Sequence, residues 1–241
     1  MSDAEARPGS VVVPGNWRGR LRDDRSVPPP PSVRPPQQDR TRETWQRVLD
    51  TGLELLEAGG WDALTISEVC RRCGISPPSL YARVDGRAGL FFAVWEYGIA
   101  RVVETQRNLA RAATPADDLA GAVRSAAEVM FGVFEAHDRF LRPVILRASV
   151  DHDLRTRGAA QSRFAIRLYM QDVPGRRTAV AAAGQAMFAE CVVRIIYGDE
   201  FFLGRTESPA EFLNRIATAA TATIAAAGPA VVDEDWPIPL E

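Results

Sequence analysis

The sequence contains no lysine, and all 29 of its basic residues are arginine. Cysteine is also scarce, with 3 copies in 241 residues. Three cysteines cannot all pair within one chain, and they are too few to staple a core of this size, so a disulfide scaffold is excluded. The longest weakly interrupted apolar run, residues 217–227, is alanine-rich and much shorter than the roughly 18 residues that a membrane span needs. We therefore expect no membrane span.

The overall charge balance gives no sign of a nucleic-acid partner. The formal net charge is −2, with 46% hydrophobic and 25% charged residues, which is ordinary for a globular protein. The first five residues include two acidic residues and lack an apolar segment, so we expect no signal peptide and a cytoplasmic location. A GC-rich genome explains the preference for arginine simply. Arginine is also the side chain that pairs in a bidentate manner with phosphate or guanine.

Residues 1–38 are predicted to form a disordered, Pro/Arg-rich arm. Prolines at 28–31 and at 35–36 fix the backbone φ angle and remove hydrogen-bond donors. Between Arg7 and Arg42, eight arginines stand against three acidic residues. Such a segment is either a solvated linker or an arm that contacts DNA, and both interpretations stay open.

From about residue 40 the apolar residues recur with a helical period, and no convincing strand is present. The first helix is expected to end at Gly59–Gly60. A helix from Asp85 to about Arg111 follows two short ones. Later helices are expected at 115–137, 139–149, 152–171, 176–197 and 208–227. The predicted fold class is all-α, with a three-helix helix-turn-helix domain at 39–97, a helical-bundle domain at 98–228 and a tail at 229–241.

Residues 65–84 predict a helix, a tight glycine turn and a second helix. Thr65 and Glu68 have the spacing of a capping box at the start of the first of these helices. Gly74 permits a left-handed turn, and Ser76 is a natural N-cap for the next helix. This is the helix-turn-helix arrangement, whose second helix enters the major groove of DNA. Short helical hairpins also occur in ordinary bundles, so the pattern alone does not establish DNA binding.

Two longer motifs make the pattern more specific. They are Trp61-Asp62-Ala63-Leu64-Thr65-Ile66 and Cys73-Gly74-Ile75-Ser76-Pro77-Pro78-Ser79-Leu80-Tyr81. With them, residues 44–96 resemble the DNA-binding domain of the TetR (tetracycline repressor-like) family. Members of that family carry a variable, all-helical C-terminal domain that dimerises and binds a small molecule. The chain departs from the family after the Leu-Tyr step, where Ala82-Arg83-Val84 replaces the usual His or Tyr followed by Phe.

The resemblance implies DNA contacts for seven residues. Thr65, at the start of the first of the two short helices, would bond a phosphate. Arg83 can pair with guanine, and Arg87 stands at a helix N-terminus, where the dipole also attracts phosphate. The implied DNA-binding residues are Thr65, Ser76, Pro78, Ser79, Tyr81, Arg83 and Arg87.

Large apolar residues on the C-terminal helices predict either an ordinary bundle core or an apolar ligand cavity between helices. In the second interpretation, Tyr169 and Glu190 would be the polar anchors. The candidate ligand-binding residues are Met130, Phe131, Phe134, Phe164, Tyr169, Met187 and Glu190.

The last two expected helices carry small residues on one face, which lets helices approach closely. Internal packing accounts for such a face, and so does an isologous dimer through a four-helix bundle. The family resemblance favours the homodimer. The small residues are Ala179, Ala182, Ala183, Ala186, Ala217, Ala220, Thr221 and Ala227, with Phe212, Leu213, Ile216 and Ile224 beside them.

The remaining motifs do not favour catalysis or metal binding. Cys70 and Cys73 have the spacing of a redox or zinc pair, but no second ligand pair lies nearby, so core packing is favoured. In Asp151-His152-Asp153, consecutive helical side chains point in different directions, and Asp151 is better explained as a helix cap. No catalytic motif is present. We expect neither an enzyme nor a bound cofactor or metal.

The sequence thus predicts a homodimeric, TetR-like DNA-binding transcriptional regulator of the repressor type. Its partners would be double-stranded DNA carrying a pseudopalindromic operator and a small apolar effector that releases the protein from that operator. The alternative is a helical dimer that binds a protein partner, or binds DNA without ligand control. A C-terminal core without a cavity would favour this alternative.

Overall fold

The computed structural model describes residues 39–113, 116–228 and 236–237. This part of the chain contains nine helices and no strand, which confirms the expected all-α fold. The expected arm at 1–38 and all but two residues of the expected tail at 229–241 lie outside the described residues. The helices are α2 (Asp39–Ala63), α3 (Ile66–Cys73), α4 (Pro77–Tyr81), α5 (Gly86–Ala112), α6 (Leu119–Ala136), α7 (Asp138–Ala148), α8 (His152–Met170), α9 (Arg177–Tyr197) and α10 (Pro209–Ala226).

Local capping sets several of these boundaries. α6 begins four residues later than expected because the side chain of Asp118 caps it, accepting a hydrogen bond from the Gly121 amide at 2.7 Å. Asp151 caps α8 as expected, accepting from the Leu154 amide at 3.1 Å. The break predicted for the first helix lies inside α2, where Gly60 has a φ of +63°. A further turn continues to Ala63 beyond that break.

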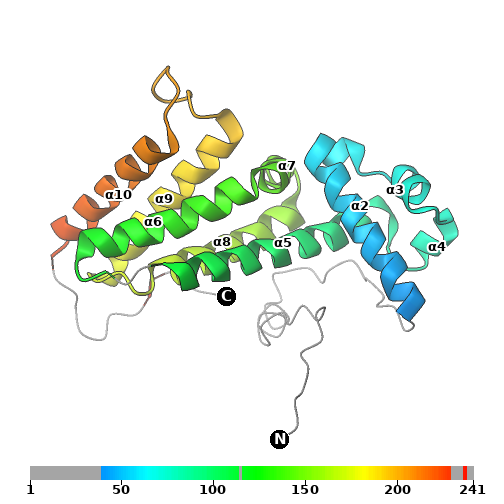
Figure 1. Ribbon diagram of the computed structural model, residues 1–241, viewed down its shortest axis with the longest axis horizontal. Coiled ribbons are helices and arrows are strands. Elements are labelled where there is room, and N and C mark those ends of the chain that lie inside the picture. Colours follow the sequence, from blue (N-terminus) through cyan, green and yellow to red (C-terminus); the bar gives the residue numbers. More distant parts are fainter. Residues whose placement is uncertain (1–38, 114–115, 229–235, 238–241) are drawn as a thin grey trace, which may run out of the picture.

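Two hydrophobic cores hold the helices together. The N-terminal core joins α2 to α5 and includes Leu56, Leu80 and Phe91. The C-terminal core joins α6, α8, α9 and α10 and includes Met187 and Phe212. Figure 1 shows the N-terminal helices at one end of an elongated molecule and the pair α9 and α10 at the other.

Helix α7 contributes to both cores, and α5 of the N-terminal core packs against α6 of the C-terminal core. The expected domain boundary at residues 97/98 falls within α5, a helix of 27 residues. On α7, Phe140 and Val144 belong to the N-terminal core, whereas Ile145 packs against the C-terminal core. Gly98 of α5 lies so close to the Phe140 ring that an added Cβ would overlap two ring carbons and lie 2.9 Å from a third. The two halves of the molecule therefore share buried structure.

Within the described part of the chain, α9 is long and apolar enough, by length and composition alone, to cross a membrane. It packs against α6, α8 and α10 in the bundle, and 39% of its most apolar window is buried. We therefore interpret it as a bundle helix whose outer face is also apolar.

Candidate DNA-binding site

The N-terminus of α3 is capped by Thr65, whose hydroxyl oxygen accepts a hydrogen bond from the Glu68 amide at 3.2 Å. The expected capping box is only half formed, because the Glu68 carboxylate pairs with Arg71 at 2.7 Å and Arg72 at 2.7 Å. Hydrogen bonds from Arg71 and then Arg72 lower the pKa of Glu68 to about 2. Since the Thr65 oxygen is only an acceptor in this bond, its hydroxyl proton can still be donated to a phosphate.

The turn between α3 and α4 depends on one glycine. Gly74 has φ +64° and ψ +35°, the left-handed conformation, and its amide donates to the Cys70 carbonyl. An added Cβ would meet nothing within 4 Å, so the backbone angle and not space requires glycine here. Ile75 follows, half-buried against the N-terminal core. Cys70 is buried on the inner face of α3, where desolvation raises the pKa of its thiol.

Helix α4 is held by its inner face and presents its outer face to solvent. Leu80 is fully buried and anchors the helix in the N-terminal core. Ser76 caps the helix, accepting from the Ser79 amide, and the two hydroxyls are 2.8 Å apart. Pro78 is exposed, as are both serines, and Tyr81 is 53% exposed. Four of the seven residues predicted to contact DNA are thus exposed on α4 or at its N-cap.

The two predicted arginine contacts have intramolecular neighbours. The Arg83 guanidinium lies 5.7 Å from the centre of the Trp45 ring on α2. Arg87, near the start of α5, donates through Nε to the Leu64 carbonyl at 2.8 Å and through a terminal nitrogen to the Trp61 carbonyl. Arg87 therefore ties α5 to the segment between α2 and α3, whatever contact it makes with DNA.

Comparisons with known proteins find a sequence match over this part of the chain. Residues 48–94 match the family described as bacterial regulatory proteins, tetR family. This segment of the chain, which contains α3 and α4, is therefore similar to the DNA-binding domain of that family. An uncharacterized HTH-type transcriptional regulator of Mycobacterium tuberculosis is 32% identical over 125 residues, which are 50% of this chain and 56% of that protein. The chain thus spans little more than half the length of this relative.

Solved structures share the fold over a longer part of the chain. A transcriptional regulator from Rhodococcus sp. Rha1 matches with a TM-score of 0.53 at 19% identity, covering 78% of this chain and 98% of that one. A Clostridium perfringens protein named for the regulation of fatty acid metabolism matches with a TM-score of 0.51 at 11% identity, covering 74% and 98%. At these identities the likeness establishes the fold alone.

The sequence-predicted ligand residues are only partly brought together. Met130, Phe131, Phe134 and Met187 are all buried in the C-terminal core. Tyr169 packs against that core, and burial raises the pKa of its hydroxyl. Phe164, in contrast, is 43% exposed on α8 and contributes little to a shared interior.

Glu190, the second predicted anchor, lies apart from these residues at a shallow surface pocket between α9 and α10. Its carboxylate pairs with Arg215 of α10 at 3.1 Å. The pocket is also lined by Arg194, Glu207 and Phe212, and by the connection between the two helices. Glu190 is therefore part of an ion-pair network at the end of the bundle.

Trp61 lies at the contact between the two halves of the molecule, and the sequence alone did not predict this position. The half-buried Trp61 ring is flanked by the Arg87 guanidinium of α5 at 4.3 Å and by that of Arg147 on α7 at 4.1 Å. Cation–π attraction of this kind is worth about 0.5–2 kcal/mol for each partner. The start of α5 and the end of α7 are thus held through one aromatic side chain next to the helix-turn-helix.

Sequence reasoning also missed Gln106 of α5, which is 2% exposed. Its Nε2 atom is buried and has no hydrogen-bond partner among the described residues. The signal was available, because Gln106 follows the buried Val102 by four positions and precedes the half-buried Leu109 by three, which places an amide on an apolar face.

We expect Gln106→Leu to raise the free energy of unfolding by about 1–2 kcal/mol, because an unpaired buried donor costs about that much. Urea unfolding followed by circular dichroism measures the change. Gln171→Leu, at an exposed position after α8, is the matched control and should change stability by less than about 0.5 kcal/mol. A loss of stability in Gln106→Leu would mean that this amide has a partner, and the prediction would be wrong.

Proposed function

We propose that the chain is a homodimeric, cytoplasmic transcriptional repressor that binds a pseudopalindromic operator through α4 of each copy. The observation that carries this proposal is the outer face of α4, which is fixed by the fully buried Leu80 and exposes serine, proline and tyrosine side chains. Two such helices in a two-fold dimer would lie about one DNA turn apart, on the order of 34–36 Å.

Within this proposal, the DNA contacts divide by chemistry. Ser76, Pro78 and Ser79 face base edges or nearby phosphates, and Tyr81 bonds the DNA backbone. Thr65 donates its hydroxyl to a phosphate from the N-terminus of α3, where the helix dipole also favours an anion. Arg83 and Arg87 supply the positive charge next to this surface.

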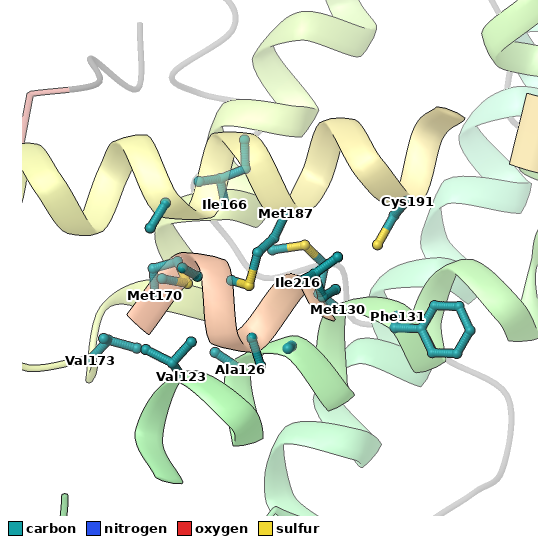
Figure 2. Close-up of a cluster of buried hydrophobic side chains, with 14 of the residues drawn as sticks. Val123, Ala126, Met130, Phe131, Ile166, Met170, Val173, Met187, Cys191 and Ile216 are labelled. Carbon is teal, nitrogen blue, oxygen red and sulfur yellow. The ribbon is translucent and has the colours of Figure 1, made fainter. Parts of the chain in front are cut away.

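A small apolar molecule entering the C-terminal core is the proposed effector. The centre of that core is lined by Met130, Met170 and Met187, each at most 1% exposed and each from a different helix. The side chains drawn in Figure 2 carry only carbon and sulfur, so the interior suits an uncharged ligand. Methionine side chains are unbranched and adapt their shape readily, so they can move aside to admit a ligand.

The coupling between effector and DNA is proposed to run through α5 and α7, because α7 contributes to both cores and α5 packs against α6 of the C-terminal core. A ligand that favours one packing of the C-terminal core would shift the population of α5 positions. The spacing of the two α4 helices would then no longer match the groove. The Trp61 contact with Arg87 and Arg147 would carry part of this change toward the DNA-binding domain.

One observation favours a second candidate function, a helical dimer that binds DNA or a protein partner without ligand control. The predicted ligand residues in the C-terminal core are closely packed, with Phe134 and Phe188 ring centres 5.0 Å apart and Phe131 and Phe212 also 5.0 Å apart. The pocket near Glu190 lies elsewhere. Failure of every apolar compound in a broad panel to release bound DNA would favour this candidate.

The proposed function is tested by selecting binding sites from random duplex DNA with purified protein at physiological salt. Enrichment of a two-fold pseudopalindrome is expected, and it would support both sequence-specific binding and the dimer. Absence of enrichment with folded, dimeric protein would contradict direct operator binding by the unliganded chain.

Substitutions of Arg83 and Arg87 should change the affinity for the selected operator in different ways. Arg83→Ala is expected to cost roughly 10-fold or more at particular base pairs and little elsewhere. Arg87→Ala is expected to weaken binding to every sequence. It should also reduce the slope of the logarithm of the binding constant against the logarithm of the salt concentration by about 1. Fluorescence anisotropy with operator and base-substituted duplexes measures both effects.

Arg155→Ala, at an exposed position on α8, is the control and should change neither quantity. Because Arg87 also bonds two carbonyl oxygens, its variant needs a parallel unfolding measurement to show that it remains folded. If the two variants lost affinity in the same pattern across sequences, the assigned roles would be wrong.

A further inference from the structure

The sequence that precedes α2 concentrates positive charge in a chain whose net charge is −2. Residues 7–38 contain six arginines against two aspartates, and four of these arginines lie between Arg18 and Arg25. Three of the four stand in the run Trp17-Arg18-Gly19-Arg20-Leu21-Arg22, which has no acidic residue. A cationic segment in a slightly acidic chain favours a polyanionic partner at this end of the protein.

This segment joins the fold beside the exposed helix α4. The Trp45 ring, six residues after the start of α2, lies with its centre 5.7 Å from the Arg83 guanidinium, just beyond the end of α4. The Cys73 thiol at the end of α3 donates to the Arg47 carbonyl at 3.5 Å. Figure 1 shows the start of α2 at the same end of the molecule as α3 and α4. Since six helical residues cover about 9 Å, the chain before Asp39 starts close to the surface proposed to bind DNA.

The chain is long enough for these arginines to reach a neighbouring groove. The 18 residues between Arg20 and Asp39 can span at most about 60 Å. Half a helical turn of DNA, which separates the major groove from the next minor groove along the axis, is only about 17 Å. Arg42 and Arg47 are exposed on the first turns of α2, with Glu43 as the exposed acidic residue between them. Positive charge therefore continues from the segment to the fold.

The tripeptide Arg18-Gly19-Arg20 has the chemistry that suits the minor groove of A/T-rich DNA. That groove is narrow, and its strengthened negative potential attracts inserted arginine. The central glycine has no side chain, so its backbone can lie close to the groove floor. A G·C pair adds the guanine N2 amino group, a donor, and the guanidinium has no acceptor to offer it. The tripeptide should therefore discriminate A·T from G·C pairs.

We propose that Arg18 and Arg20 enter the minor groove of an A/T-rich segment that flanks the operator, one such segment for each copy of the chain. Arms that precede a DNA-binding domain can read the minor groove in this way while a helix reads the major groove. The inference rests on the proposed operator binding, and it adds a second base-reading element in a groove that α4 does not enter.

The test measures the affinity of the full-length protein for three duplexes that share the selected operator and differ only in its flanks. The flanks are A·T, G·C or inosine·cytosine pairs. Inosine lacks the N2 amino group, so inosine·cytosine keeps the major-groove edge of G·C without its minor-groove donor. By fluorescence anisotropy at physiological salt, the wild type is expected to bind the A·T and inosine·cytosine duplexes equally, and roughly 10-fold more tightly than the G·C duplex.

Two double variants separate base reading from charge. Arg18→Ala with Arg20→Ala should abolish the difference between flanks. Arg25→Ala with Arg34→Ala removes the same charge from the same segment and should weaken binding to all three duplexes while keeping the difference. Circular dichroism checks that both variants fold like the wild type.

The contrary outcomes are distinguishable. Equal wild-type affinity for all three duplexes would overturn the minor-groove contact and leave operator binding standing. Inosine·cytosine flanks that behave like G·C flanks would place the reading outside the minor groove. A flank difference that survives in Arg18→Ala with Arg20→Ala, or that disappears equally in both double variants, would overturn the role of the tripeptide. A selection that yields no operator would overturn the proposed function and this inference together.

Discussion

Glu207→Ala is expected to lower the free energy of unfolding by about 3 kcal/mol, because it leaves two arginines without their shared carboxylate. Glu207 is 5% exposed and lies between Arg194, at 3.4 Å, and Arg215, at 2.8 Å. Both guanidiniums also lie over the Phe212 ring, at 4.8 and 5.3 Å from its centre. Urea unfolding measures the loss. Glu128→Ala, at an exposed position on α6, is the control and should cost less than about 0.5 kcal/mol.

The Glu207 carboxylate should also make the free energy of unfolding depend on pH. The hydrogen bond from Arg215 is the largest cause that lowers the pKa of Glu207 below its ordinary value. The stabilisation from this carboxylate is therefore fully present above the pKa of an unfolded glutamate, about 4.3. It is lost as the pH falls through the lower pKa of the folded state. Glu207→Gln should thus differ most from wild type above about pH 5, and the difference should shrink on acidification. A constant difference from pH 7 to pH 3.5 would contradict the ion pairing.

Gly98→Ala is expected to lower the free energy of unfolding by about 2 kcal/mol, although alanine is the better helix former by about 1 kcal/mol. The new methyl group would overlap the Phe140 ring, which is 1% exposed and has no room to move. Thermal and urea unfolding measure the effect. Gly158→Ala on α8 is the matched control, because nothing lies within 4 Å of its added Cβ, and it should be neutral or stabilising.

A second substitution, at Phe140, tests whether the overlap with its ring causes the destabilisation by Gly98→Ala. In a Phe140→Leu background the overlapping ring carbons are absent, so Gly98→Ala should cost at least about 1 kcal/mol less than it does in the wild type. Equal costs in the two backgrounds would mean that the α5–α7 contact is not the origin of the loss.

The helix-turn-helix could be predicted closely because its determinants are local. Gly74, Ser76 and the apolar Leu80 act through the backbone and through neighbours a few residues away, so spacing alone encodes them. The capping-box prediction was half wrong for a related reason. The spacing of Thr65 and Glu68 was correct, but Arg71 and Arg72 on the same helix compete for the carboxylate.

Features that depend on several distant helices could not be predicted. The network around Glu207 draws residues from α9, α10 and their connection, and no local pattern indicates it. The small residues of α9 and α10 were recognised as a close-packing face. Which of them point inward depends on the rotation of each helix, and Ala183 and Ala220 are used within the monomer. Binding of a ligand in the C-terminal core would require that core to open, and the proposed ligand-binding residues remain predictions.

Because α7 contributes side chains to both cores, unfolding of one half of the molecule affects the other half. Phe140 and Val144 would be exposed if the N-terminal half opened, and Ile145 would be exposed if the C-terminal half did. Melting either half therefore removes part of the support of the other. Independent unfolding units need an interface that can separate at little cost, and this one includes the tight contact of Gly98 with Phe140. The DNA-binding and C-terminal halves should accordingly melt as one cooperative unit.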